Sequence, residues 1–212
     1  MRIALLNEFS QAAKNTVIFQ ELSAVTQENG HHAYNLGMKD DNDHYLTYLN
    51  LGVMASLLIN TDAVDFIITG CGTGQGALAA LNAFPGVVCG YCIEPTDAFL
   101  FAQINNGNAL SIPYAKGFGW GAELNLNNIF RNAFGSERGQ GYPQERKESQ
   151  NRNAANLFVM KQAIAKDYLQ ALKAIDQTIV RESVLGKDFQ KYFFENCKDD
   201  TIRAYIESLI SQ

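Results

Sequence analysis

The stretch DFIITGCGTGQG, residues 65–76, decides the fold. Its first part, residues 65–69, is short, apolar and β-branched, which predicts a buried strand. Residues 77–83 are rich in Ala and Leu and predict a helix directly after the glycines. Glycine allows the backbone to turn sharply between the two elements. A strand, a glycine loop and a helix in this order are typical of a parallel α/β unit.

The same alternation continues on both sides of this unit. Five strands are predicted at residues 2–6, 31–36, 65–69, 86–91 and 109–112. Five helices are predicted at residues 14–29, 45–59, 77–83, 96–105 and 121–134. Strands that alternate with helices favour a parallel sheet with helices on both faces. We therefore expect an α/β fold, a three-layer α/β/α sandwich around a five-stranded parallel Rossmann-like sheet.

The last third of the chain has a different pattern. Residues 135–153 are polar and Gly-rich and predict a long loop. One long amphipathic helix is then predicted, with apolar residues three or four positions apart at Leu157, Met160, Ile164, Tyr168, Leu172, Ile175 and Ile179. Two short helices follow at residues 188–197 and 201–210. We divide the chain into an α/β domain, residues 1–150, and a helical extension, residues 151–212, which packs on the core or on a partner subunit.

Composition excludes several classes of protein. A chain of 212 residues with 47% hydrophobic residues has the core of one folded domain with an appendage, and a net charge of -5 argues against nucleic-acid binding. No apolar run reaches the roughly 18 residues of a membrane span. The chain opens directly on a strand pattern instead of a secretion signal. Its four cysteines form no disulfide framework, so we expect a cytoplasmic protein.

The glycine loop predicts a site for an anion. In open α/β sheets, ligands bind at the carboxyl ends of the strands, where this loop lies. Its backbone N–H groups and the start of the next helix favour an anion or an oxygen that becomes one. They also favour the thiolate of Cys71, which suits proton abstraction beside a carbonyl. No metal or cofactor is needed for that chemistry.

Two other interpretations stay open. A lone cysteine such as Cys71 is often only a small buried apolar residue. Gly72, Gly74 and Ala77 also fit a lenient dinucleotide fingerprint, which would make the protein a nucleotide-dependent oxidoreductase. That fingerprint normally follows the first strand, whereas this loop follows the third. Cys89 and Cys92 have the spacing of a redox or metal pair, but packing is the favoured interpretation.

Several motifs occur in an order known from one family. They are Gly70-Cys-Gly-Thr-Gly-x-Gly76, Ala79-Ala-x-Asn82, Glu94-Pro95, Asn105-Asn-x-Asn108 and, in part, Gly141 through Arg146. In these motifs the sequence resembles the type B ribose-5-phosphate isomerases and the galactose-6-phosphate isomerase subunits. The resemblance covers about residues 1–152. It implies a five-stranded parallel sheet in a homodimer, or a dimer of dimers, whose active sites take residues from two subunits.

The resemblance also implies a reaction and the residues that perform it. The reaction interconverts an aldose phosphate and a ketose phosphate through an enediol. Cys71 would be the base, and Thr73 would bond a sugar hydroxyl. The amides of Gly72, Gly74, Gln75 and Gly76 would hold the enediolate oxygen. Asn105 and Arg146 match positions that bind the substrate.

Departures from the family pattern concern ring opening and phosphate binding. Glu8 stands where the family has a catalytic Asp, and Phe9 replaces a phosphate-binding His. Ile104 replaces the ring-opening His. His44 is a candidate substitute for it, or else an ordinary histidine at the surface or at a helix start. The expected function is an isomerase of a pentose or hexose phosphate. The alternative is a non-catalytic sugar-phosphate-binding protein or one subunit of a hetero-oligomeric isomerase.

Overall fold

The computed structural model describes residues 1–211 and contains one parallel sheet. Its strands are β1 (Arg2–Leu6), β2 (His32–Asn35), β3 (Phe66–Cys71), β4 (Cys89–Tyr91) and β5 (Ala109–Pro113). They lie in the order β2-β1-β3-β5-β4, and every pair is parallel. The predicted α/β sandwich is confirmed.

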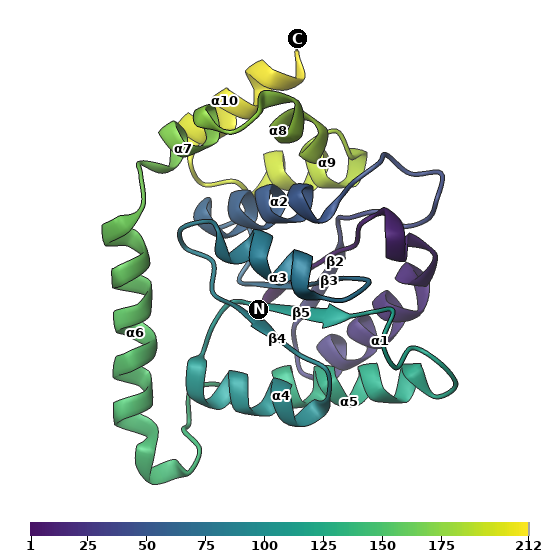
Figure 1. The fold of residues 1–212 in the computed structure, drawn as a ribbon, viewed down its shortest axis with the longest axis vertical. Helices are drawn as coiled ribbons and strands as arrows, with labels where there is room; N and C mark the ends of the chain where they lie inside the picture. The colour runs from purple at the N-terminus through teal and green to yellow at the C-terminus, as the bar shows by residue number, and fades with distance from the viewer. Residues whose placement is uncertain (212) are drawn as a thin grey trace.

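Helices cover both faces of the sheet (Figure 1). One face carries α2 (Tyr48–Asn60) and α3 (Gln75–Asn82), and the other carries α1 (Asn15–Glu28), α4 (Pro95–Leu100) and α5 (Ala122–Phe134). Successive strand residues point to opposite faces. Ala4 and Ile67 therefore belong to the core under α2, and Ile3 and Phe66 belong to the core under α1 and α5.

Four C-terminal helices pack on the outer side of α2. They are α7 (Tyr168–Ala174), α8 (Gln177–Ser183), α9 (Lys187–Asn196) and α10 (Asp200–Ile210). Leu172, Val180 and Phe193 are fully buried in the same cluster as the residues of α2. Asn50 in α2 donates a hydrogen bond to Ser183 Oγ at 3.1 Å. The helix α2 is therefore enclosed between the sheet and these four helices.

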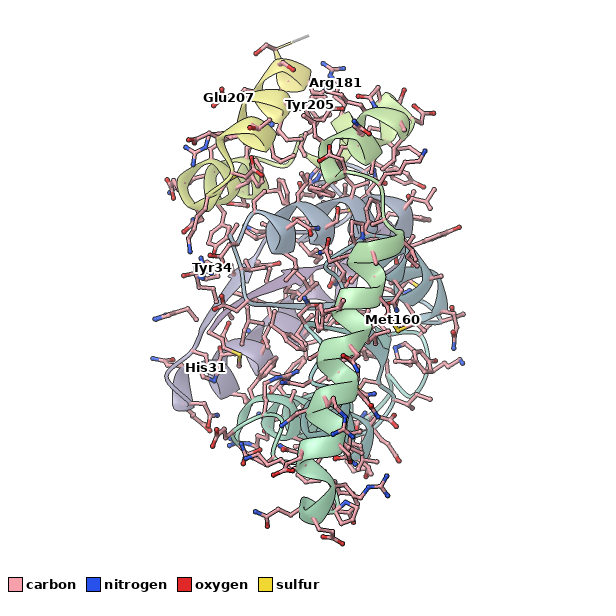
Figure 2. All side chains as sticks on the ribbon, turned by 90° about the vertical axis from the view of Figure 1, so that its left-hand side faces the viewer. His31, Tyr34, Met160, Arg181, Tyr205 and Glu207 are labelled. Carbon is pink, nitrogen blue, oxygen red and sulfur yellow. The ribbon has the colours of Figure 1, made fainter. Side chains whose placement is uncertain are left out.

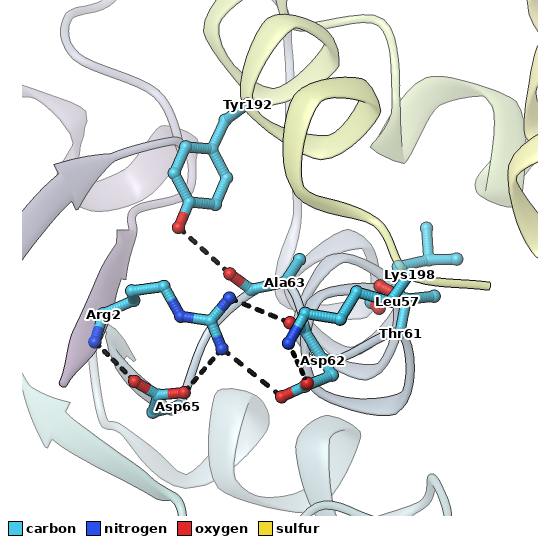
Figure 3. A network of polar contacts seen from close by, with 8 residues as sticks. All are labelled: Arg2, Leu57, Thr61, Asp62, Ala63, Asp65, Tyr192 and Lys198. Atoms are coloured by element: carbon cyan, nitrogen blue, oxygen red, sulfur yellow. Dashed lines mark hydrogen bonds and ion pairs between the residues drawn. The ribbon is translucent and has the colours of Figure 1, made fainter.

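Polar contacts add a second connection between the sheet and the extension (Figure 3). Arg2 of β1 forms ion pairs with Asp62 at 3.3 Å and Asp65 at 2.7 Å. Lys198 also pairs with Asp62, and Tyr192 of α9 donates to the Ala63 carbonyl at 3.0 Å. The first strand, the turn after α2 and the C-terminal helices thus meet in one network.

The expectations for residues 135–179 are wrong in two respects. The loop is shorter than predicted, because α6 (Lys147–Ile164) begins inside it. The single long helix is interrupted, because Ala165 and Ile175 have extended backbone. Asp167 and Asp176 then accept hydrogen bonds from the first turns of α7 and α8, so they start new helices.

Helix α6 packs along one side against the π-helix Phe101–Asn105 and is exposed along the other. It lies at the edge of the molecule in Figure 1, and in Figure 2 it faces the viewer, with Met160 labelled on it. None of its residues, all of which the structure describes, is buried. Val159, Met160 and Ile164 are 66%, 64% and 87% exposed, although they are apolar. Met160 and Ile164, four positions apart, lie on the same side of this 18-residue helix, whereas Val159 points to another side.

Candidate active site

Cys71 lies at the carboxyl edge of the sheet, where β3 and β5 end. The strand β3 is two residues longer than predicted, since Gly70 and Cys71 pair with Ile112 and Pro113 of β5. Beyond the strands, Tyr114 N donates to the Cys71 carbonyl at 3.1 Å. Cys71 is 8% exposed, so its thiol is largely shielded from solvent in this structure.

Side chains from the neighbouring strands fix the glycine loop after Cys71. Tyr91 of β4 donates its hydroxyl to the Thr73 carbonyl at 2.9 Å, and Ser111 of β5 donates to the Gly74 carbonyl at 2.7 Å. Gly74 has φ of +72°, which favours glycine, and α3 begins at the next residue. These bonds fix the backbone of the loop and the direction of its N–H groups.

Thr73 lies between the thiol and the start of α3. Its Oγ1 is 4.0 Å from Cys71 Sγ and accepts a hydrogen bond from Gln75 N at 3.3 Å. A thiol beside fixed amide donors is an arrangement that suits proton abstraction next to a carbonyl. The predicted loop residues 71–76 are therefore together at one edge.

Glu8 joins this edge from the end of β1. It is 2% exposed and caps the 3₁₀ turn Phe9–Lys14, accepting from Ser10 N at 3.1 Å and from Ser10 Oγ at 2.5 Å. A Cβ on Gly72 would lie 3.5 Å from Gln11 Nε2 and 4.0 Å from Ser10 Oγ. The turn therefore lies directly beside the glycine loop. Sequence reasoning missed Ser10 and Gln11, which match no motif.

Lys14 brings a positive charge to the same edge. Its Nζ donates to Gln11 Oε1 at 2.8 Å and to the Tyr114 carbonyl at 2.5 Å, and lies 4.7 Å from the centre of the Phe118 ring. Partial burial lowers the pKa of Lys14. No ion pair of Lys14 is found among residues 1–211. No carboxylate of the described residues therefore neutralises its charge.

Aromatic side chains form one wall of the edge. Phe9 stacks on Tyr45 with ring centres 4.8 Å apart, and the two are 45% and 61% exposed. A Cβ on Gly76 would lie 3.1 Å from the ring of Tyr48. Phe9 of this wall occupies the position at which the resemblance implied a phosphate-binding histidine.

His44 lies close to this wall, but its free nitrogen is covered. Its Nδ1 is 2.8 Å from Asp43 Oδ1, and its Nε2 is buried with no hydrogen-bond partner among the described residues. A Cβ on Gly186, just before α9, would lie 2.8 Å from that Nε2. The ring therefore faces the C-terminal helices in this structure.

Asn105 and Arg146 lie at the opposite edge of the sheet. Asn105 ends the π-helix Phe101–Asn105, just before β5 begins at its amino end. Arg146 is the N-cap residue of α6, which packs against that π-helix. The five residues of β5 span about 16 Å between the two edges. One copy of the chain therefore does not bring Asn105 and Arg146 to Cys71.

Cys89 and Cys92 do not form a shared site. They belong to the two different core clusters, on opposite faces of the sheet. Burial raises the pKa of Cys92 to about 12 and also raises that of Cys89. Among residues 1–211, no group of three or more His, Cys, Asp or Glu side chains could hold a metal ion.

Comparison with known proteins assigns the family. A family model described as Ribose/Galactose Isomerase matches residues 3–141, well over half of the chain. The chain belongs to the ribose/galactose isomerase family. As a member, it is an aldose–ketose isomerase. A second model, described as Ribose-5-phosphate isomerase, matches residues 163–209, which form α7 to α10 in this isomerase.

Solved structures extend the likeness to the whole chain. A ribose-5-phosphate isomerase from Vibrio parahaemolyticus is 56% identical, with a TM-score of 0.97 and 99% of each chain covered. A 4-deoxy-L-threo-5-hexosulose-uronate ketol-isomerase complexed with a tartrate is 50% identical, with a TM-score of 0.97 and 100% of each chain covered. The type B ribose 5-phosphate isomerase of Leishmania infantum shares the fold at 21% identity and a TM-score of 0.63; 77% of this isomerase and 98% of that chain are covered. No curated protein matches. Among residues 1–211, no helix is long and apolar enough to cross a membrane.

Proposed function

We propose that this isomerase interconverts an aldose and a ketose phosphate through an enediol, with Cys71 as the acid and base. The observation that carries the proposal is the thiol of Cys71 at the mouth of a fixed glycine loop. Cys71 takes the proton from C2 of the aldose and returns it to C1. The amides of Gly72 and Gly76 stabilise the enediolate oxygen, and Thr73 binds a neighbouring hydroxyl. The amides of Gly74 and Gln75 donate to the Cys71 carbonyl and to Thr73 Oγ1, so they hold the shape of the loop.

The active enzyme is a homodimer, or a dimer of dimers, with shared sites. Asn105 and Arg146 lie at the amino edge of the sheet, and Cys71 lies at the carboxyl edge. A second copy supplies both residues to the site of the first. The exposed apolar residues Met160 and Ile164 support this arrangement, because they belong to the helix that Arg146 caps and are left uncovered by the described residues of their own chain.

The second candidate substrate is a keto-uronate, which carries a carboxylate in place of a phosphate. Two features favour it. Phe9 and Ile104 stand at the positions where the sugar-phosphate isomerases have histidines. In addition, one of the solved structures that match over the whole chain is a uronate ketol-isomerase. Lys14 suits either acid group, since an ammonium binds carboxylate and phosphate as a point charge.

A panel of substrates decides between these candidates, and it also tests whether the chain is active without a second type of subunit. The purified chain is assayed with ribose 5-phosphate, with hexose 6-phosphates and with 4-deoxy-L-threo-5-hexosulose-uronate. Turnover of a phosphate supports the first candidate, and turnover of the uronate alone supports the second. No turnover of any of them by the purified homo-oligomer contradicts the proposed function and favours a subunit of a hetero-oligomeric isomerase.

The location we propose is the cytoplasm. All four cysteines are free and buried in the described part of the chain. Free thiols, including one with a catalytic role, are typical of a reducing compartment.

A further inference from the structure

Three side chains at the end of β1 form a hydrogen-bonded series beside the glycine loop. Ser10 Oγ donates to Glu8 Oε1 at 2.5 Å, and Gln11 Nε2 donates to Ser10 Oγ at 3.1 Å. Lys14 Nζ donates to Gln11 Oε1 at 2.8 Å. That last bond fixes which end of the Gln11 amide faces Ser10, because a carbonyl oxygen accepts from the ammonium and the amide nitrogen must then donate.

The series also fixes the hydroxyl of Ser10. A serine hydroxyl has one proton and two acceptor positions. The hydroxyl donates its proton to Glu8 Oε1, and one of its acceptor positions takes the N–H of Gln11 Nε2. One acceptor position remains free on a side chain that is exposed and lies beside Gly72. This free position can accept a hydrogen bond from a substrate hydroxyl.

The isomerisation itself requires a second proton transfer, which Cys71 does not perform. Conversion of an aldose to a ketose moves one proton from C2 to C1 and another from O2 to O1. We infer that Ser10, backed by Glu8, carries the oxygen-bound proton. This inference rests on the proposed function, because it assigns the second half of the same reaction.

The transfer balances within the site. The O2–H bond breaks as its proton passes to Ser10 Oγ, while the proton of Ser10 passes to the Glu8 carboxylate. The electron pair of the O2–H bond becomes the C2=O2 double bond when C1 takes its proton from Cys71. The proton then returns along Glu8 and Ser10 to O1. No external acid, base or oxidant takes part.

The test follows two rates in D2O for wild-type enzyme and for Ser10→Ala. The substrate is ribose 5-phosphate or 4-deoxy-L-threo-5-hexosulose-uronate, whichever the wild-type enzyme converts. One rate is conversion to product, and the other is exchange of the carbon-bound hydrogen of recovered substrate with solvent deuterium. Ser10→Thr keeps the hydroxyl, and Ser23→Ala in α1 removes a serine hydroxyl away from the site.

We expect Ser10→Ala to lower conversion by about 10²-fold or more, the usual contribution of general acid–base catalysis. Carbon–hydrogen exchange persists, because Cys71 is intact, so the ratio of exchange to conversion rises. Ser10→Thr recovers most of the conversion, and Ser23→Ala changes neither rate. Unchanged conversion in Ser10→Ala overturns the inference, and so does an equal fall of both rates. No conversion by the wild-type enzyme instead overturns the proposed function.

Discussion

Gly74 is the one glycine of the loop, residues 70–76, that has a positive φ. Its φ is +72°, and a Cβ there would lie 2.7 Å from the Tyr91 ring and 3.0 Å from Pro113 N. Gly117 also has a positive φ, +64°, but has no atom within 4 Å of such a Cβ. A substitution at Gly117 tests the backbone strain of a positive φ alone. A substitution at Gly74 adds the steric conflict with Tyr91 and Pro113.

We therefore expect Gly74→Ala to lower the free energy of unfolding by about 2–4 kcal/mol, and Gly117→Ala by only about 1 kcal/mol. Urea unfolding followed by circular dichroism measures both. Equal effects of the two substitutions would show that the contact with Tyr91 does not constrain the loop.

The sequence predicts the part of the site that the glycine loop forms. Cys71, Thr73 and the glycines lie in a contiguous motif, so their proximity follows from the chain itself. The contact between Lys14 and Tyr114 joins residues 100 positions apart, and no local pattern indicates it. Ser10 was missed for a related reason, since its role depends on which way the turn after Glu8 faces.

Helix α6 is the element that the proposed dimer depends on. If it carries Arg146 to the site of a partner, each site takes Cys71 from one chain and Arg146 from the other. Cys71→Ala and Arg146→Ala homodimers are then both inactive. A mixed dimer of the two variants contains one intact site.

We expect mixed dimers, made by co-expression with two tags and tandem purification, to recover up to half of the wild-type activity. The matched control pairs Cys71→Ala with Thr73→Ala, which lie on the same edge and leave no intact site in any mixed dimer. Equal inactivity of both mixtures would contradict shared sites.

The elements were predictable where burial imposes a period on the sequence. Residues 66–71 are all buried, and the strand was found, although its last two residues read as part of the glycine loop. Residues 147–153 contain no apolar side chain, so the first turns of α6 left no periodic signal. The breaks before α7 and α8 depend on Asp167 and Asp176, whose capping role was hidden by continuous apolar spacing.

At the scale of the whole molecule, ion pairs connect the first strand to the last helices (Figure 3). The hydrogen bond from Lys198, with the charge of Arg2, holds the pKa of Asp62 below its ordinary value. A carboxyl with a lowered pKa stabilises the folded state above its unfolded pKa of about 3.9, and this contribution is lost as the pH falls through the folded pKa.

Asp62→Asn should therefore lower stability at pH 7, by less than about 1 kcal/mol because the pair is exposed. The difference from wild type should shrink as the pH falls below about 4. Urea unfolding from pH 7 to pH 3 measures it, with Asp41→Asn, an exposed aspartate in the loop before α2, as the control. A stability difference that grows toward acid pH would contradict the predicted direction of the pH dependence.

The central claim for the whole molecule is that a thiol at the carboxyl edge of the sheet moves the carbon-bound proton. The most direct measurement is the exchange of that hydrogen with D2O in wild-type enzyme and in Cys71→Ala, on a substrate that the wild type converts. We expect wild type to convert and to incorporate solvent deuterium. Cys71→Ala should lose both activities by about 10²–10⁴-fold while keeping its fold. Conversion and exchange at wild-type rates in Cys71→Ala would contradict the account.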